Sequence, residues 1–180
     1  MRKLLLGIGF VAGGIAIAAT LAVATSATAS APDDLQAAQA ALSRYHSFTQ
    51  ALTDGYSVED EPCVQAPPPP GLTGAMGIHA VNEALLRDPA IDPLRPELLL
   101  YMPKGNGQLE LVGVEYMRIA ADQVPPIDTA DRPSIFGVPF DGPMPEHVPG
   151  MGWHYDIHLW FWKDNPAGFF APFNPALSCP

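Results

Sequence analysis

Several histidines and acidic residues of this 180-residue chain lie inside otherwise apolar stretches. An imidazole or carboxylate buried there loses its hydration at a considerable cost, unless it is paired, protonated, hydrogen-bonded or bound to a metal ion. The same side chains are the usual ligands of zinc, copper, iron and manganese. The sequence therefore predicts a site for one of these divalent transition metals, and its candidate ligands are His79, Glu115, Asp156 and His158, with His154 as a further candidate.

The spacing within residues 154–158 decides which of these groups can meet. On a strand, His154, Asp156 and His158 project from one face, because side chains alternate. The two histidines would lie roughly 13 Å apart, near the limit for sharing an ion. A metal site made of Asp156 and one of these histidines would therefore need a further ligand from another element of the fold, such as His79 or Glu115. A helix would instead place His154 and His158 one turn apart and let them chelate together.

Other interpretations of the same residues remain open. Each histidine could make structural hydrogen bonds in the core, and Glu115 could form a salt bridge with Arg95 or Arg118. Strand alternation places Glu115 on the same face as Leu111 and Gly113, where a glycine leaves room for a ligand or a large side chain. His154 and Asp156 also spell the HxD pair found in non-haem iron sites, and three letters carry little specificity.

The aromatic residues favour a second class of function. Trp160 and Trp162 continue the face that carries His158, and Phe169, Phe170 and Phe173 follow soon after. Such a cluster could line a pocket or groove for an apolar molecule or a sugar face, as in a non-enzymatic envelope or ligand-binding protein. Packing of a small core explains the same aromatic residues equally simply.

The N-terminus has the organisation of an export signal. Two cations precede an apolar run over residues 4–23, and Ala27 and Ala29 supply the small residues that signal peptidase requires. The sequence therefore predicts a secretory signal peptide over residues 1–29 with cleavage before Ser30. An uncleaved membrane anchor is the alternative, because the run is near the roughly 20 residues that span a bilayer.

Export bears on the two cysteines, Cys63 and Cys179, which both follow the signal. Outside the cytoplasm thiols pair readily, so we expect a disulfide that closes a loop of more than 100 residues. A thiolate metal site or a catalytic thiol would need CxxC-like spacing or basic neighbours. Neither is present.

Charge and motifs exclude several classes of function. The chain carries a net charge of −10, and removal of the signal makes it more negative still. Nucleic acid and anionic membrane surfaces are bound by clusters of Lys and Arg, so neither is an expected partner of the mature protein. There is no Gly-rich phosphate loop, GxSxG or HExxH motif.

The elements that must position these residues form one α+β domain over residues 30–180. Apolar periodicity predicts an amphipathic helix over residues 33–53 that ends at Asp54-Gly55 and packs on a small antiparallel sheet. A hairpin is expected between residues 97–101 and 109–116, and a last strand over residues 154–162. Residues 124–149, rich in proline and glycine, are expected to form a long loop in which His147 could close over a site.

Blocks of sequence across nearly the whole mature chain carry a resemblance. Residues 74–82 (GAMGIHAVN), 96–101 (PELLLY) and 114–116 (VEY), with residues 153–162 and 165–175, resemble a family of exported bacterial proteins without an established activity. The resemblance implies export and a single domain. It assigns no catalytic residue.

Overall fold

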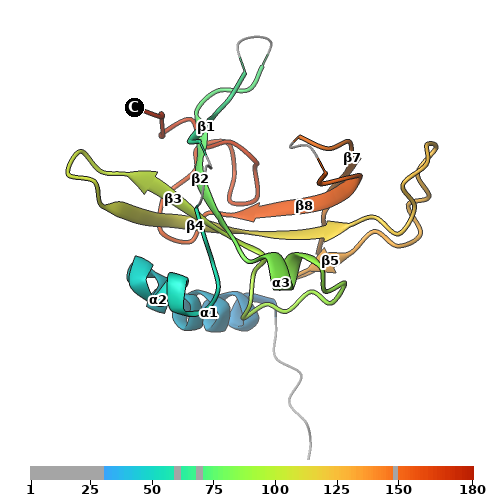
Figure 1. Cartoon of the computed structure of the whole chain (residues 1–180), viewed down its shortest axis with the longest axis horizontal. Coiled ribbons are helices and arrows are strands. Elements are labelled where there is room, and N and C mark those ends of the chain that lie inside the picture. Colours follow the sequence, from blue (N-terminus) through green and yellow to red (C-terminus); the bar gives the residue numbers. More distant parts are fainter. Residues whose placement is uncertain (1–30, 59–61, 68–70, 148–149) are drawn as a thin grey trace, which may run out of the picture.

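The computed structural model describes residues 31–58, 62–67, 71–147 and 150–180 (Figure 1). The signal peptide expected over residues 1–29 lies outside the described residues. Within the described part of the chain, no helix is long and apolar enough to cross a membrane.

A six-stranded antiparallel sheet with the order β1-β2-β3-β4-β8-β7 is the main element of the fold. A separate two-stranded sheet pairs β5 with β6. With its helices the structure confirms the α+β class, and the pairing of β3 with β4 confirms the predicted hairpin. The bounds are β1 Val64–Gln65, β2 Ala75–Val81, β3 Leu98–Pro103, β4 Leu109–Ile119, β5 Ser134–Ile135, β6 Val138–Pro139, β7 Asp141–Met144 and β8 His154–Leu159.

The helix expected over residues 33–53 is divided into three segments: α1 (Ala31–Leu42), the 3-10 turn η1 (Ser43–His46) and α2 (Phe48–Thr53). The break before α2 is due to Ser47, whose backbone is extended and whose hydroxyl accepts a hydrogen bond from the N–H of Gln50, so that it caps a new helix. Apolar periodicity does not reveal such a cap. The predicted end is correct, because α2 stops at Thr53 and Gly55 adopts a positive φ of 93°.

Two further expectations need correction. The proline-rich stretch 124–149 contains three short strands, and one of them, β7, joins the main sheet beside β8. Pro143 is tolerated in β7 because an edge strand has a neighbour on one side only. The last strand ends at Leu159 rather than at residue 162, because the N–H of Trp160 donates to Phe169 in the C-terminal tail.

Helices α1 and α2 cover one face of the sheet, below it in Figure 1. Ala38 and Leu42 of α1 are fully buried in one cluster with sheet residues such as Leu99, Val114 and Tyr116. Tyrosine hydroxyls tie the layers together, since Tyr101 donates to the carbonyl of Tyr45 at 2.7 Å. This face therefore holds the main hydrophobic core.

The opposite face is covered at one end by the C-terminal tail. Leu100, Met102, Val112 and Trp160 form a second buried cluster there, against which Cys63 and Leu177 pack. Cys63 and Cys179 form the predicted disulfide, which closes a separation of 116 residues. The other end of this face stays open for the candidate site.

A bulge in β4 changes which side chains share a face. Leu100 pairs with Gly113 but Tyr101 pairs with Leu111, so Val112 is the extra residue of β4. Leu111 thus belongs to the helix-side core, and the expectation that it shares a face with Glu115 is wrong. Gly113 leaves no room for a ligand either, because a Cβ there would lie 2.6 Å from the carbonyl oxygen of Leu159.

Glu97 is a buried carboxyl that the structure holds at the start of β3. It is 1% exposed, and its Oε2 accepts a hydrogen bond from the N–H of Met117 at 3.0 Å. Burial, together with the nearby charges of Glu115 and Asp88, raises the pKa of Glu97 from 4.5 to about 8. The folded protein therefore keeps this proton at pH values where the unfolded chain has released it.

Replacement of both cysteines by serine is expected to lower the free energy of unfolding by about 5 kcal/mol, because the open chain regains the entropy of a loop of this length. Urea unfolding of the oxidised protein and of the double variant measures the difference. Wild type treated with a reductant is the control and should match the variant. Equal midpoints for oxidised wild type and variant would contradict the stabilising role.

Glu97→Gln is expected to remove a pH dependence of stability. Between about pH 4.5 and 8 the unfolded chain binds one proton fewer than the folded protein, so wild-type stability falls as pH rises. The amide can still accept from Met117, so the variant should gain on the order of 3 kcal/mol over wild type from about pH 5 to about pH 8. Glu110→Gln, on the exposed end of β4, is the control. Parallel pH profiles for wild type and E97Q would refute the assignment.

Candidate metal centre

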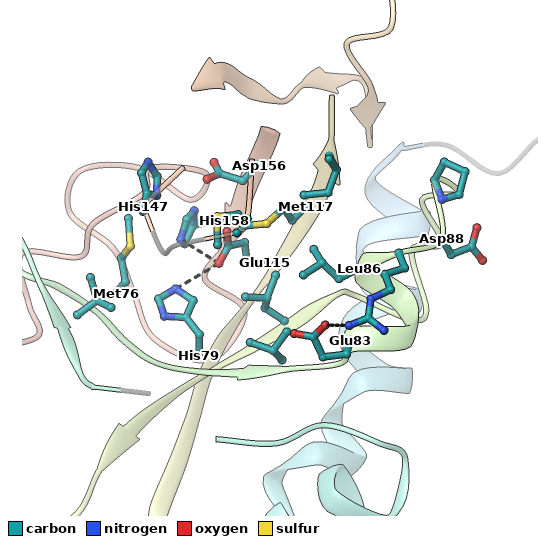
Figure 2. Close-up of a pocket in the computed structure, with 18 residues that line it drawn as sticks. Met76, His79, Glu83, Leu86, Asp88, Glu115, Met117, His147, Asp156 and His158 are labelled. Atoms are coloured by element: carbon teal, nitrogen blue, oxygen red, sulfur yellow. Dashed lines mark hydrogen bonds and ion pairs between the residues drawn. The ribbon is translucent and has the colours of Figure 1, made fainter. Parts of the chain in front are cut away.

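Three strands bring His79, Glu115 and His158 together on the open end of the sheet (Figure 2). The Nε2 atom of His79 lies 3.2 Å from Oε2 of Glu115, and Nε2 of His158 lies 3.6 Å from the same oxygen. One potential ligand atom from each of the three residues lies within 4.8 Å of the others. Two imidazole nitrogens and one carboxylate oxygen therefore face a common point.

The strand register explains this convergence. Glu115 of β4 pairs directly with His158 of β8, so their side chains rise next to each other from one face. His79 comes from β2, on the other side of β3, where it pairs with Leu100. Since β3 carries the aliphatic Leu98 and Leu100 in this region, the polar side chains of β2 and β4 meet over an apolar strand.

Two of these residues, Glu115 and His158, are buried and have polar atoms without hydrogen bonds. Glu115 is 2% exposed and His158 is 1% exposed. Among the described residues, Oε2 of Glu115 and both ring nitrogens of His158 have no hydrogen-bond partner, although the His79 contact is short. The atoms thus lie close together, but no N–H group points at its neighbour as a hydrogen bond requires. Buried polar atoms without a hydrogen bond are rare in proteins.

Charge states in the cluster suit ligation. Burial alone would raise the pKa of the Glu115 carboxyl, but the imidazoles of His158 and His79 hold that pKa below its ordinary value. Burial lowers the pKa of His158, against the opposing charge of Glu115. At neutral pH the carboxyl is therefore ionised and the His158 ring is neutral. Metal ligands need these protonation states.

The ring of His158 is held by packing. It stacks on the indole of Trp160, with ring centroids 6.5 Å apart and an angle of 20° between the planes. The Trp160 indole is fixed in turn, because its Nε1 donates to the carbonyl of Ala171 at 2.7 Å. The C-terminal tail therefore helps to orient a candidate ligand through Trp160.

Asp156 and His154 lie on the same strand but outside the three-residue cluster. Oδ2 of Asp156 is 3.9 Å from Nε2 of His154, too far for a hydrogen bond, and Nδ1 of His154 contacts the carbonyl of Gly152 at 3.0 Å. Burial and the charges of Glu115 and Asp141 raise the pKa of Asp156 to about 8, whereas burial lowers the pKa of His154. Of the three residues His154, Asp156 and His158 of β8, His158 alone belongs to the three-residue cluster.

A cavity of about 720 Å³ opens over the cluster. Asp156 lines it together with the three clustered residues, and exposed His147 lies at its edge. The rest of its wall is largely aliphatic or thioether. The principal apolar residues are Val64, Met76, Val81, Leu86, Leu98 and Met117.

Sequence reasoning missed the wall that α3 (Glu83–Leu86) contributes. A signal was present: Asn82 caps this short helix by accepting hydrogen bonds from the N–H groups of Ala84 and Leu85. The cap turns the chain at the end of β2 and places Leu86 over the cavity. The alternative salt bridge of Glu115 with Arg95 or Arg118 is not formed in the described part of the chain, where His79 and His158 lie next to the carboxylate.

The aromatic residues do not form a shared pocket in the described part of the chain. Trp160 is 3% exposed and belongs to the tail-side cluster, whereas Trp162 packs against His46 and the helix-side core. Neither indole lines the large cavity. The aromatic face therefore contributes packing on both sides of the sheet.

No protein-family model, curated protein or solved structure matches this chain. The resemblance to exported bacterial proteins stays a prediction from the sequence blocks.

Proposed function

We propose that this protein is exported and binds one divalent transition-metal ion through His79, Glu115 and His158. The observation that carries the proposal is the convergence of three potential ligand atoms, of which the Glu115 oxygen and the His158 nitrogen are buried and have no hydrogen-bond partner among the described residues. A cation at their common point would satisfy the carboxylate oxygen and one nitrogen of each ring. It would also offset the cost of burying an ionised carboxyl group.

The donor set narrows the class of metal. Two imidazoles and one carboxylate form the ligand set of many catalytic zinc sites and of non-haem iron sites, and the cluster contains no thiolate. Structural zinc sites are usually closed by four protein ligands, whereas catalytic sites keep a position for water or substrate. Three protein ligands beside a large cavity support a centre with an exchangeable position.

The disulfide supports the part of the proposal that concerns export. The disulfide between Cys63 and Cys179 is typical of an oxidising compartment outside the cytoplasm, in agreement with the predicted signal peptide over residues 1–29. A site made only of imidazole and carboxylate groups tolerates such a compartment, because none of its ligands is oxidised to a disulfide. We therefore propose that the protein works outside the cytoplasm, where such a site can bind its metal.

Purified protein stripped with a chelator is expected to bind one equivalent of Zn²⁺ or Co²⁺. His79→Ala, His158→Ala and Glu115→Gln each remove one ligand, so each should weaken binding by more than the roughly 10–100-fold cost of losing an outer-shell partner. Isothermal titration calorimetry measures the affinity. The thermal midpoint of wild type should rise with metal, because a ligand of the folded state stabilises it.

Two matched variants control for the loss of a histidine or a carboxyl group elsewhere. His46→Ala removes an exposed imidazole on the helix side, and Glu97→Gln removes a buried carboxyl outside the cluster. Both should bind metal like wild type. Substoichiometric binding by wild type, or equal affinity in E115Q and E97Q, would reject the proposed centre.

A further inference from the structure

We infer that the open position of this centre takes a small molecule with an apolar body and a single oxygen-donor head group, of which a carboxylate is the simplest example. The inference rests on the proposed metal function and names the class of ligand for the same site. It follows from three features of the cavity: where the ligand atoms lie, what the walls are made of, and where the polar rim is.

The potential metal ligands lie on the sheet side of the cavity. His79, Glu115 and His158 all project from strands of the main sheet, as Figure 2 shows. Asp156 is the other buried carboxyl on the wall, and it comes from the same sheet surface. The buried polar groups of the lining are thus gathered on one side, so a ligand would meet them with one end only.

The rest of the lining is largely apolar. Val81, Leu98 and Met117 project from the same sheet beside the cluster. Leu86 comes from α3, and Met76 and other aliphatic residues complete the lining. A volume of about 720 Å³ lies within the range of typical small-molecule sites, which hold drug-sized ligands. These walls offer no hydrogen bonds to the body of a ligand, so binding there must come from apolar contact.

Charged residues mark the end of the cavity away from the cluster. Glu83 and Arg87 form an exposed ion pair at 2.7 Å, and Asp88 lies beside them in Figure 2. Because Arg87 already pairs with Glu83, it is not a free cation for an acidic head group. The strongest partner for an anionic oxygen is therefore the metal, whose charge exceeds that of Glu115.

Titration of the Co²⁺-loaded protein with straight-chain carboxylates from acetate to decanoate tests the inference. The visible spectrum of cobalt reports direct ligation, so each carboxylate that binds at the metal should change it. Affinity should rise about fourfold with each added methylene, as expected for burial of one CH₂ group, until the cavity is filled. The same series with the metal-free protein shows what the walls bind alone.

Leu86→Trp fills part of the cavity and should weaken octanoate far more than acetate, at equal cobalt loading. Leu52→Trp is its matched control, because Leu52 is 51% exposed on α2, against the opposite face of the sheet. The L52W variant should keep the wild-type dependence on chain length.

The outcomes separate the two proposals. Absence of cobalt binding would reject the metal function itself. Normal cobalt binding with affinities independent of chain length, or no spectral change with any carboxylate, would overturn only the inferred ligand class. Equal affinities in the cobalt-loaded and metal-free protein would show that the metal does not anchor the head group, and would also overturn it.

Discussion

The carboxyl group of Glu115 is the constraint on which the account of this structure depends. It lies in the middle of β4, almost completely shielded from water, and a ring nitrogen of His79 and one of His158 lie 3.2 and 3.6 Å from its Oε2. Neither the His79 nor the His158 contact satisfies its Oε2 atom with a hydrogen bond. Such an arrangement is costly in a protein without a ligand, and it becomes favourable when a cation occupies the common point.

One face of the sheet holds the main hydrophobic core, and the other face holds the candidate metal centre. The helix side is packed with aliphatic residues and tyrosines and needs no ligand. On the other side the tail, anchored by Cys179, covers one end, and there Trp160 holds the ring of His158 by stacking. The disulfide therefore contributes to the candidate centre indirectly, through the tail segment that fixes the Trp160 indole.

Much of the candidate site could be predicted from local sequence. Alternation along a strand is enough to place His154, Asp156 and His158 on one face, and a carboxylate within Val-Gly-Val-Glu-Tyr had to find a partner. That Glu115 meets His79 and His158 rather than Asp156 depends on the register between strands that are distant in the sequence. Local sequence patterns do not contain this register. The bulge at Val112 and the helix cap at Ser47 were missed because each is one residue acting against a regular period.

X-ray absorption spectroscopy of the protein loaded with one equivalent of Zn²⁺ tests the central claim most directly. The account predicts a first shell of nitrogen and oxygen at about 2.0–2.2 Å, with the outer-shell scattering of two imidazoles and no sulfur. In H158A the signal of one imidazole should disappear. A spectrum with one imidazole or none in wild type, or one unchanged in H158A, would contradict the account.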